Sequence, residues 1–271
     1  MPELPEVETT LRGITPHIKG QIVSKVIIRH PKLRWPIPPK LPQLIEQQTL
    51  QSLNRRAKYL LLNFESGTLL IHLGMSGSLR IITTDTAPAK HDHFEILFTH
   101  RQGIRLTDPR RFGAVLWLGK TPHTHALLNK LGPEPLSNDF SADYLYQISR
   151  QRKVSIKQFI MNQNIVTGIG NIYCTEVLFY ASINPTRAAG QISANEYHHL
   201  VIEIKKTLSL AINQGGTSLR DFVGSDGKPG YFKQQLSAYG RKGLPCIYCK
   251  QALTEIKQSG RTTIYCSTCQ K

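Results

Sequence analysis

The C-terminal stretch 246–269, CIYCKQALTEIKQSGRTTIYCSTC, contains one Cys-x-x-Cys pair at Cys246 and Cys249 and another at Cys266 and Cys269. Each two-residue gap lets a tight turn aim both sulfurs at one point, and four thiolates suit a tetrahedral zinc ion. Four protein ligands leave no open position for water, so we expect one structural Zn2+ held on a short β-hairpin. Two disulfides are the alternative.

Upstream of this module the hydrophobic pattern changes twice. Helical patterns occupy residues 144–148, 155–161, 172–180 and 195–213. Short alternating or β-branched runs predict antiparallel strands at residues 23–28, 59–64, 68–72, 79–83, 94–98 and 114–118. Apolar residues three or four apart within residues 4–19 indicate an amphipathic helix entered through Pro5. The pattern breaks at residues 131–135, so we place a domain boundary near residue 132.

Composition indicates an intracellular protein with a polyanionic partner. The 271 residues include 34 Lys and Arg against 18 Asp and Glu, a formal net charge of +16, which favours nucleic acid. A basic surface without a ligand, or one that binds anionic membranes, is the alternative. No apolar run approaches the ~20 residues of a membrane helix. The acidic, Pro-rich start is unlike a signal peptide, so we expect a cytoplasmic location.

Two loops have the composition of DNA-contacting loops. In residues 108–113, Arg110 and Arg111 precede Phe112, so cations able to neutralise phosphates stand beside an apolar wedge for the base stack. The alternative is a surface turn with Phe112 folded into the core. The loop at residues 72–77 offers a similar exposed tip.

The glycine-rich turn at residues 168–173 lies between two predicted helices. We expect Asn171 to be the N-cap of the second helix, with its amides and side chain available to a phosphate. An ordinary connection between helices is the alternative. Cys174, which follows, is expected to be a small core residue.

The N-terminus suggests nucleophilic chemistry. The initiator Met is expected to be removed before a small residue such as Pro2, which would expose a secondary amine. An α-amine has a pKa of ~8, well below that of lysine, so a useful fraction is neutral and nucleophilic near pH 7. Glu3 and Glu6 stand beside it as candidates for general acid and base. The alternative is that this segment simply begins a helix.

These motifs together resemble the formamidopyrimidine-DNA glycosylase family, also called MutM. The resemblance spans essentially the whole chain and includes the zinc module. Leu4 favours this family over the related endonuclease VIII branch, which prefers oxidised pyrimidines and typically has glycine there. The motifs are residues 2–8, 56–60, 72–77, 107–113, 166–173 and 230–232.

The resemblance implies a catalytic set. Pro2 would attack the sugar C1′, Glu3 would donate a proton during base loss, and Glu6 would support them. Lys58 would assist β-elimination and Arg261, on the zinc hairpin, δ-elimination.

The resemblance also implies DNA contacts. Met75, Arg110 and Phe112 would fill the space left by the flipped base and face the opposite cytosine. Further residues in DNA-contacting motifs are His72, His91, Arg111, Arg152, Lys157 and Asn171. The base-pocket loop would begin with Thr217, Ser218, Leu219, Arg220, Asp221 and Phe222. Cys174 and Thr175 follow the turn of Asn171. They depart from the family, which often has small or acidic residues at these positions.

The expected fold is α+β. An N-terminal helix and antiparallel β-sandwich would occupy residues 2–132, a helical domain with a helix-two-turn-helix residues 133–237, and a zinc-finger hairpin residues 238–271. The protein is expected to be a DNA glycosylase and abasic-site lyase that excises 8-oxoguanine and formamidopyrimidines from damaged double-stranded DNA. We expect a monomer that uses no organic cofactor and does not bind a membrane. The rivals are an endonuclease VIII-like enzyme and a non-catalytic zinc-ribbon DNA-binding protein.

Overall fold

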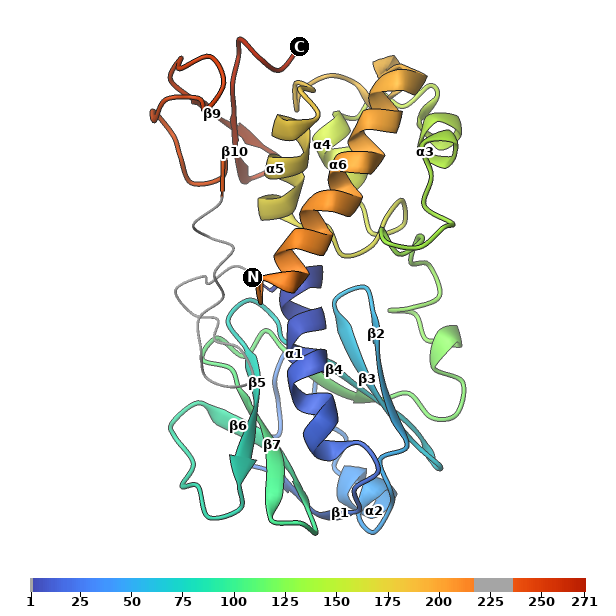
Figure 1. Cartoon of the computed structure of the whole chain (residues 1–271). Coiled ribbons are helices and arrows are strands. Elements are labelled where there is room, and N and C mark those ends of the chain that lie inside the picture. The colour runs from blue at the N-terminus through green and yellow to red at the C-terminus, as the bar shows by residue number, and fades with distance from the viewer. Residues whose placement is uncertain (1, 217–235) are drawn as a thin grey trace. The chain divides into compact units, whose positions relative to one another are not determined.

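The computed structural model describes residues 2–216 and 236–271, which form two compact units (Figure 1). The first unit holds residues 2–129 and 214–216, and the second holds residues 130–213 and 236–271. The Cys-containing module therefore belongs to the same compact unit as the helices. The chain returns to the first unit at residues 214–216. No helix among the described residues is long and apolar enough to cross a membrane.

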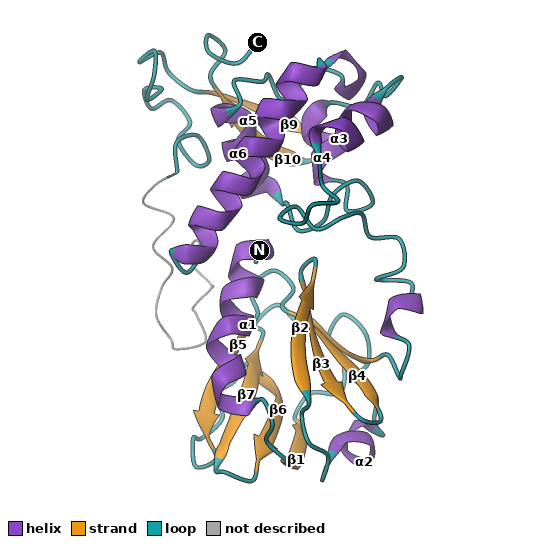
Figure 2. Ribbon diagram, turned by 45° about the vertical axis from the view of Figure 1, so that its right-hand side comes forward, coloured by secondary structure: helices purple, strands orange, loops and turns teal. Residues whose placement is uncertain are grey.

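The first unit is a β-sandwich with a long helix, as predicted. Helix α1 contacts strands of both sheets, which Figure 2 shows as separate layers. All strand pairs are antiparallel. One sheet has the strand order β1 (Val23–Ile28), β6 (Asp92–Phe98), β7 (Gln102–Thr107) and β5 (Ser78–Thr83). The other has the order β2 (Ser52–Arg56), β3 (Tyr59–Phe64), β4 (Gly67–His72) and β8 (Ala114–Trp117). The helices are α1 (Leu4–Ile18), α2 (Leu41–Ile45) and a 3-10 turn at Pro122–Thr124.

The core of this unit follows from the hydrophobic pattern. Leu60, Leu62 and Phe64 alternate along β3 and are buried, while the residues between them are partly exposed. Ile14 and Ile18 lie four apart on α1 and are fully buried in the same core. Full burial of such a side chain contributes about 1.5–3 kcal/mol, which fixes α1 against the sandwich.

Two strands were not predicted, β2 and β7, because both carry arginines where a strand pattern calls for apolar residues. Arg105 of β7 is buried, but Glu95 accepts from its Nε at 2.8 Å and Asp92 lies 3.4 Å from its Nη1. A buried cation is tolerated where its charge is paired in this way. Sequence pattern does not reveal such pairing, since the partners lie on a neighbouring strand.

The second unit is helical, and all four predicted helices are confirmed. Its elements are α3 (Ala142–Ser149), α4 (Ile156–Met161), α5 (Asn171–Tyr180), α6 (Ala194–Asn213), a 3-10 turn at Ala189–Gln191 and the hairpin β9 (Thr254–Gln258) and β10 (Arg261–Tyr265). Ser141 and Ser155 cap α3 and α4 by accepting from backbone N–H groups. The hairpin packs on α5 through a small apolar cluster that includes Phe179 and Ile264.

Arg261 lies on the hairpin, as the resemblance implies, where it begins β10 and pairs with Gln258. The tip is Ser259 and Gly260, whose φ angles of 48° and 73° are both positive. Two-residue turns with positive φ match the right-handed twist of the flanking strands. The turn therefore fixes Arg261 at a defined strand position.

Candidate functional site

The two N-terminal carboxylates are buried at the start of α1. Glu3 is 2% exposed and Glu6 is fully buried. They form a capping box, in which Glu6 Oε2 accepts from the Glu3 backbone N at 2.8 Å. The positive end of the helix dipole favours carboxylates here. The capping box therefore holds two acidic groups directly after Pro2, which is itself buried.

The backbone at Gly216 passes against Glu6. A side chain at Gly216 would place its Cβ 3.0 Å from Glu6 Oε1, and the φ of Gly216 is +79°. Both features favour glycine at this position. The predicted base-pocket residues 217–222 follow immediately, but they lie outside the described residues.

Lys58 lies in the two-residue turn between β2 and β3 and is only 4% exposed. Arg55, which was not predicted as a site residue, links this turn to α1. Its Nη1 donates to the Ala57 carbonyl at 2.9 Å, and its Nε donates to Glu8 of α1 at 2.8 Å. Ala57 has a φ of +53°, a left-handed conformation that such a contact helps to hold. The hairpin of Lys58 is thus tied to α1, the helix whose N-terminal end carries Glu3 and Glu6.

His72 ends β4 and is neutral at pH 7. Burial, with added repulsion from Lys58 and Arg34, lowers the pKa of His72 to about 4. Its Nδ1 accepts from the Gly74 backbone N at 3.1 Å, which assigns the remaining ring proton to Nε2. His72 therefore holds the start of the next loop and has no charge to offer a phosphate at neutral pH.

Three exposed side chains from two loops carry the predicted wedge. Phe112 is 45% exposed and Met75 is 40% exposed, so Phe112 does not fold into the core. The guanidinium of Arg110 lies 4.9 Å from the Phe112 ring centroid, a cation–π contact. Exposed apolar side chains beside a cation are the composition expected of a group that enters a base stack.

Two further predicted contacts lie around the same loop. Arg111 is exposed with a φ of +56°, and its Nη1 lies 2.7 Å from His30 Nε2. His91 is partly exposed, and its ring stands edge-on to His93 with centroids 6.3 Å apart.

In the second unit, Asn171 differs from its expected place by one residue. Gly170 is the N-cap of α5 and Asn171 is the first helical residue. Asn171 Nδ2 donates to the Thr262 carbonyl of the hairpin at 3.0 Å. Its Oδ1 is buried and lacks a hydrogen-bond partner among the residues that the structure describes. The side chain thus links α5 to the strand of Arg261.

Lys157 is buried, which argues against a direct phosphate contact. The side chain is 1% exposed, and its Nζ donates to the Thr262 carbonyl at 3.1 Å and to Thr263 Oγ1 at 2.7 Å. Both acceptors lie in β10 next to Arg261. Lys157 therefore holds the hairpin in place from α4. Arg152, by contrast, is exposed in the segment between α3 and α4.

A cavity of about 380 Å³ opens beside Arg261, between α4 and the turn of the hairpin. Its polar lining includes Gln158, Asn162 and Ser259, together with Lys157. The strand position of Arg261 thus directs its side chain to an open space lined by hydrogen-bonding groups.

Glu176 is another residue that the sequence did not single out. It lies on α5, is fully buried, and accepts from the backbone N atoms of Ser237, Ala238 and Tyr239 at 2.7, 2.9 and 2.7 Å. Burial raises the pKa of Glu176, while the three donors act against that shift. The carboxylate anchors the chain as it enters the Cys-containing module.

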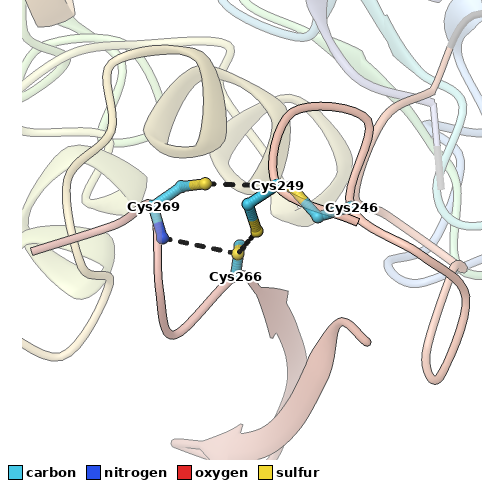
Figure 3. Close-up of side chains that lie close together, drawn as sticks. All are labelled: Cys246, Cys249, Cys266 and Cys269. Carbon is cyan, nitrogen blue, oxygen red and sulfur yellow. Dashed lines mark hydrogen bonds between the residues drawn. The ribbon is translucent and has the colours of Figure 1, made fainter. Parts of the chain in front are cut away.

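The four module cysteines converge on one point, as Figure 3 shows. Their sulfurs all lie within 4.8 Å of one another, and two Sγ pairs are 3.4 and 4.0 Å apart. A disulfide requires about 2.05 Å, so the two-disulfide alternative does not describe this arrangement. Four sulfurs about 2.3 Å from a tetrahedral zinc would stand about 3.8 Å apart, so the cluster fits such an ion. Cys174 is buried apart from it, as predicted.

Comparisons with known proteins agree along the whole chain. Residues 1–115 match the formamidopyrimidine-DNA glycosylase N-terminal domain, and residues 131–223 match the H2TH domain of the same enzymes. The chain is 58% identical to the formamidopyrimidine-DNA glycosylase of Psychromonas ingrahamii and 56% identical to that of Cellvibrio japonicus, with 100% of each chain covered.

Solved structures give the same result. A Lactococcus lactis Fpg mutant in complex with DNA containing Fapy-dG has a TM-score of 0.93 at 32% identity, with 100% of both chains covered. The MutM protein of Thermus thermophilus has a TM-score of 0.88 at 34% identity, with 99% of this chain and 98% of that chain covered. With its N-terminal and H2TH domains matched in order and full-length relatives more than half identical, this chain belongs to the formamidopyrimidine-DNA glycosylase family.

Proposed function

We propose that this protein is a bifunctional DNA glycosylase and abasic-site lyase that acts on 8-oxoguanine and formamidopyrimidines in duplex DNA. The observation that carries the proposal is the start of α1, where Pro2 directly precedes two buried carboxylates, Glu3 and Glu6. Complexes of Lactococcus lactis Fpg with DNA containing Fapy-dG or an abasic site support the substrate class.

The first chemical step uses the Pro2 amine. Once Met1 is removed, this secondary amine attacks C1′ of the damaged nucleoside. The C1′–N bond to Pro2 forms as the glycosidic bond breaks, and Glu3 supplies the proton that base loss requires. The attached amine then loses its N–H proton, the C1′–O4′ bond of the sugar breaks and O4′ takes up a proton. The product is an iminium, the Schiff base of a secondary amine, which links Pro2 to the opened sugar.

Two eliminations then cut the strand. Loss of a C2′ proton from the iminium expels the 3′ phosphate, and a second elimination expels the 5′ phosphate. Lys58 assists the first and Arg261 the second. The contacts from Arg55 to Glu8 and to Ala57 support this role for Lys58, because they tie its turn to α1.

The remaining parts of the site serve recognition. The net charge of +16 attracts the DNA backbone, and Met75, Arg110 and Phe112 occupy the space of the extruded base. One Zn2+ on the four module cysteines holds the hairpin of Arg261. The enzyme works as a monomer in the bacterial cytoplasm and needs no organic cofactor.

The lesion preference separates this proposal from its rival. A crystal structure of the Lactococcus lactis enzyme with DNA containing an oxidised pyrimidine shows that such DNA also binds this fold. We expect single-turnover excision of 8-oxoguanine opposite cytosine to be faster than excision of thymine glycol. The opposite ranking would assign the chain to the pyrimidine-specific activity. A non-catalytic zinc-ribbon protein would excise neither base.

Substitution of Phe112 should affect base excision more than strand cutting. We expect Phe112→Ala to slow excision of 8-oxoguanine from duplex DNA by at least about tenfold, because unstacking a base costs a few kcal/mol and tenfold is about 1.4 kcal/mol. Cutting at a preformed abasic site should suffer less, since no base has to be unstacked. Single-turnover rates on both substrates test this. Ile22→Ala, which removes a similarly exposed apolar side chain of the same unit, is the control. Equal losses on both substrates would indicate a general binding defect instead.

The cysteine cluster gives a second prediction. Cys249→Ala should lower the zinc content from one ion per chain and weaken DNA binding by at least about tenfold, because structural zinc supplies much of a small module's folding energy. The sandwich at residues 2–129 should stay folded, as protease resistance of that unit would show. Cys174→Ala, at a buried cysteine outside the cluster, should keep one zinc. Absence of zinc from pure, active wild-type protein would contradict the assignment.

A further inference from the structure

We propose that Asp108 is a positioning residue that locks the loops of Met75, Arg110 and Phe112 into a single wedge. The inference rests on the proposed function, because the wedge matters only if the protein extrudes a damaged base. Asp108 is fully buried, so we assign it no contact with substrate. Its role comes from what it holds together.

The Asp108 side chain bridges two loops. Oδ2 accepts from the Gly113 backbone N at 2.7 Å, which closes the β7–β8 loop around Arg110 and Phe112. Oδ1 accepts from Ser76 Oγ at 3.4 Å, and Ser76 is the residue after Met75 in the β4–β5 loop. One carboxylate thus contacts both of the loops that carry the exposed wedge.

The Asp108 backbone adds three contacts to the same place. Its N donates to the His91 carbonyl at 2.9 Å, and its carbonyl accepts from the Arg111 backbone N at 3.2 Å. His93 Nε2 lies 3.0 Å from that carbonyl and donates to it. The contacts with His91 and His93 therefore fix Asp108 from outside the two loops that its side chain holds.

The two loops also touch backbone to backbone. A Cβ at Gly74 would lie 2.4 Å from Gly113 N and 2.5 Å from the Phe112 carbonyl carbon. A Cβ at Gly113 would lie 2.7 Å from the His72 carbonyl oxygen and 2.9 Å from Asp108 Oδ2. No side chain fits between the loops at either place. This close approach lets a single carboxylate reach both.

Exposure explains why the wedge needs such a lock. Met75 and Phe112 are 40% and 45% exposed, so packing alone does not fix them before DNA binds. A group that must enter a base stack works best when it is already ordered, because ordering it on binding costs conformational entropy. Fixing the backbone under the three side chains supplies that order. Loss of Asp108 should therefore slow base extrusion more than the chemistry that follows.

The test compares two activities in the same variants. We expect Asp108→Ala to slow single-turnover excision of 8-oxoguanine from duplex DNA at least about tenfold more than it slows cutting at a preformed abasic site. Asp108→Asn should restore most of the excision rate, because its Oδ1 still accepts from Gly113 N. Fluorescence of 2-aminopurine beside the lesion should show slowed extrusion in the alanine variant alone. In a protein that already carries Phe112→Ala, Asp108→Ala should lower the excision rate only slightly further, since both substitutions act on the same step.

Two further variants keep the test decisive. Ser76→Ala removes one link of the lock and should shift the same ratio by a smaller factor, even if Asp108→Ala folds poorly. Thr68→Val removes a partly buried hydrogen bond to Asn63 elsewhere in the sandwich and should leave the ratio unchanged. Equal loss of both activities in the Asp108 and Ser76 variants, or no loss, would overturn the proposal. Wild-type protein unable to excise 8-oxoguanine would instead overturn the proposed function.

Discussion

Glu3→Gln should lower the rate of 8-oxoguanine excision from duplex DNA by about 100- to 10,000-fold, the usual contribution of a positioned proton donor. The glutamine keeps the size of the side chain and a carbonyl oxygen that can accept from the Glu6 backbone N in the capping box. It cannot donate the proton that the departing base requires. Glu3 is 2% exposed, so water is poorly placed to replace it.

Strand cutting at a preformed abasic site should persist in Glu3→Gln, because that substrate has already lost its base. Single-turnover assays on both substrates measure the divergence. Glu46→Gln is the matched control, since Glu46 also accepts a backbone N–H in the same unit, from Val26 at 2.8 Å, and lies outside the proposed site. If both activities of Glu3→Gln fell together, the carboxylate would serve the fold of α1 and not proton transfer.

Much of the fold follows from local pattern. Helix α1 and strand β3 were predicted to within a residue, because their apolar spacing and the turn residues around them agree. Strands β2 and β7 were missed because Arg55 and Arg105 interrupt the pattern. The compensating contacts of Arg105 come from Glu95, on a strand paired only in the folded chain.

Parts of the site could not be predicted, because they depend on contacts between residues far apart in the sequence. Lys157 is separated from Thr262 by more than a hundred residues, so its burial against the hairpin had no signal in the sequence. Asp108 lies before a proline in a turn, where aspartate is common because it stabilises the turn locally. The sequence therefore offered no reason to expect its contact with Ser76. By contrast, the convergence of the four cysteines followed from spacing alone.

The nucleophile prediction has the largest expected effect. A retained Met1 or an acetyl group on Pro2 should abolish covalent trapping and strand cutting, because no free Pro2 amine remains. Pro2→Gly should retain some lyase activity through a primary amine. Lys58 is the rival nucleophile, but a lysine has a pKa of ~10.4 against ~8 for an α-amine, so a smaller fraction is neutral near pH 7.

The most direct measurement is borohydride trapping of the protein on DNA containing 8-oxoguanine, followed by mass spectrometry of the crosslinked peptide. Samples with a free Pro2 and samples that retain Met1 are compared at equal DNA occupancy. We expect the free-Pro2 sample to form a reduced crosslink on the N-terminal peptide, with the added mass on Pro2, and the Met1-retaining sample to form none. A crosslink of equal yield in the Met1-retaining sample, mapped to Lys58 or another lysine, would contradict the proposed mechanism.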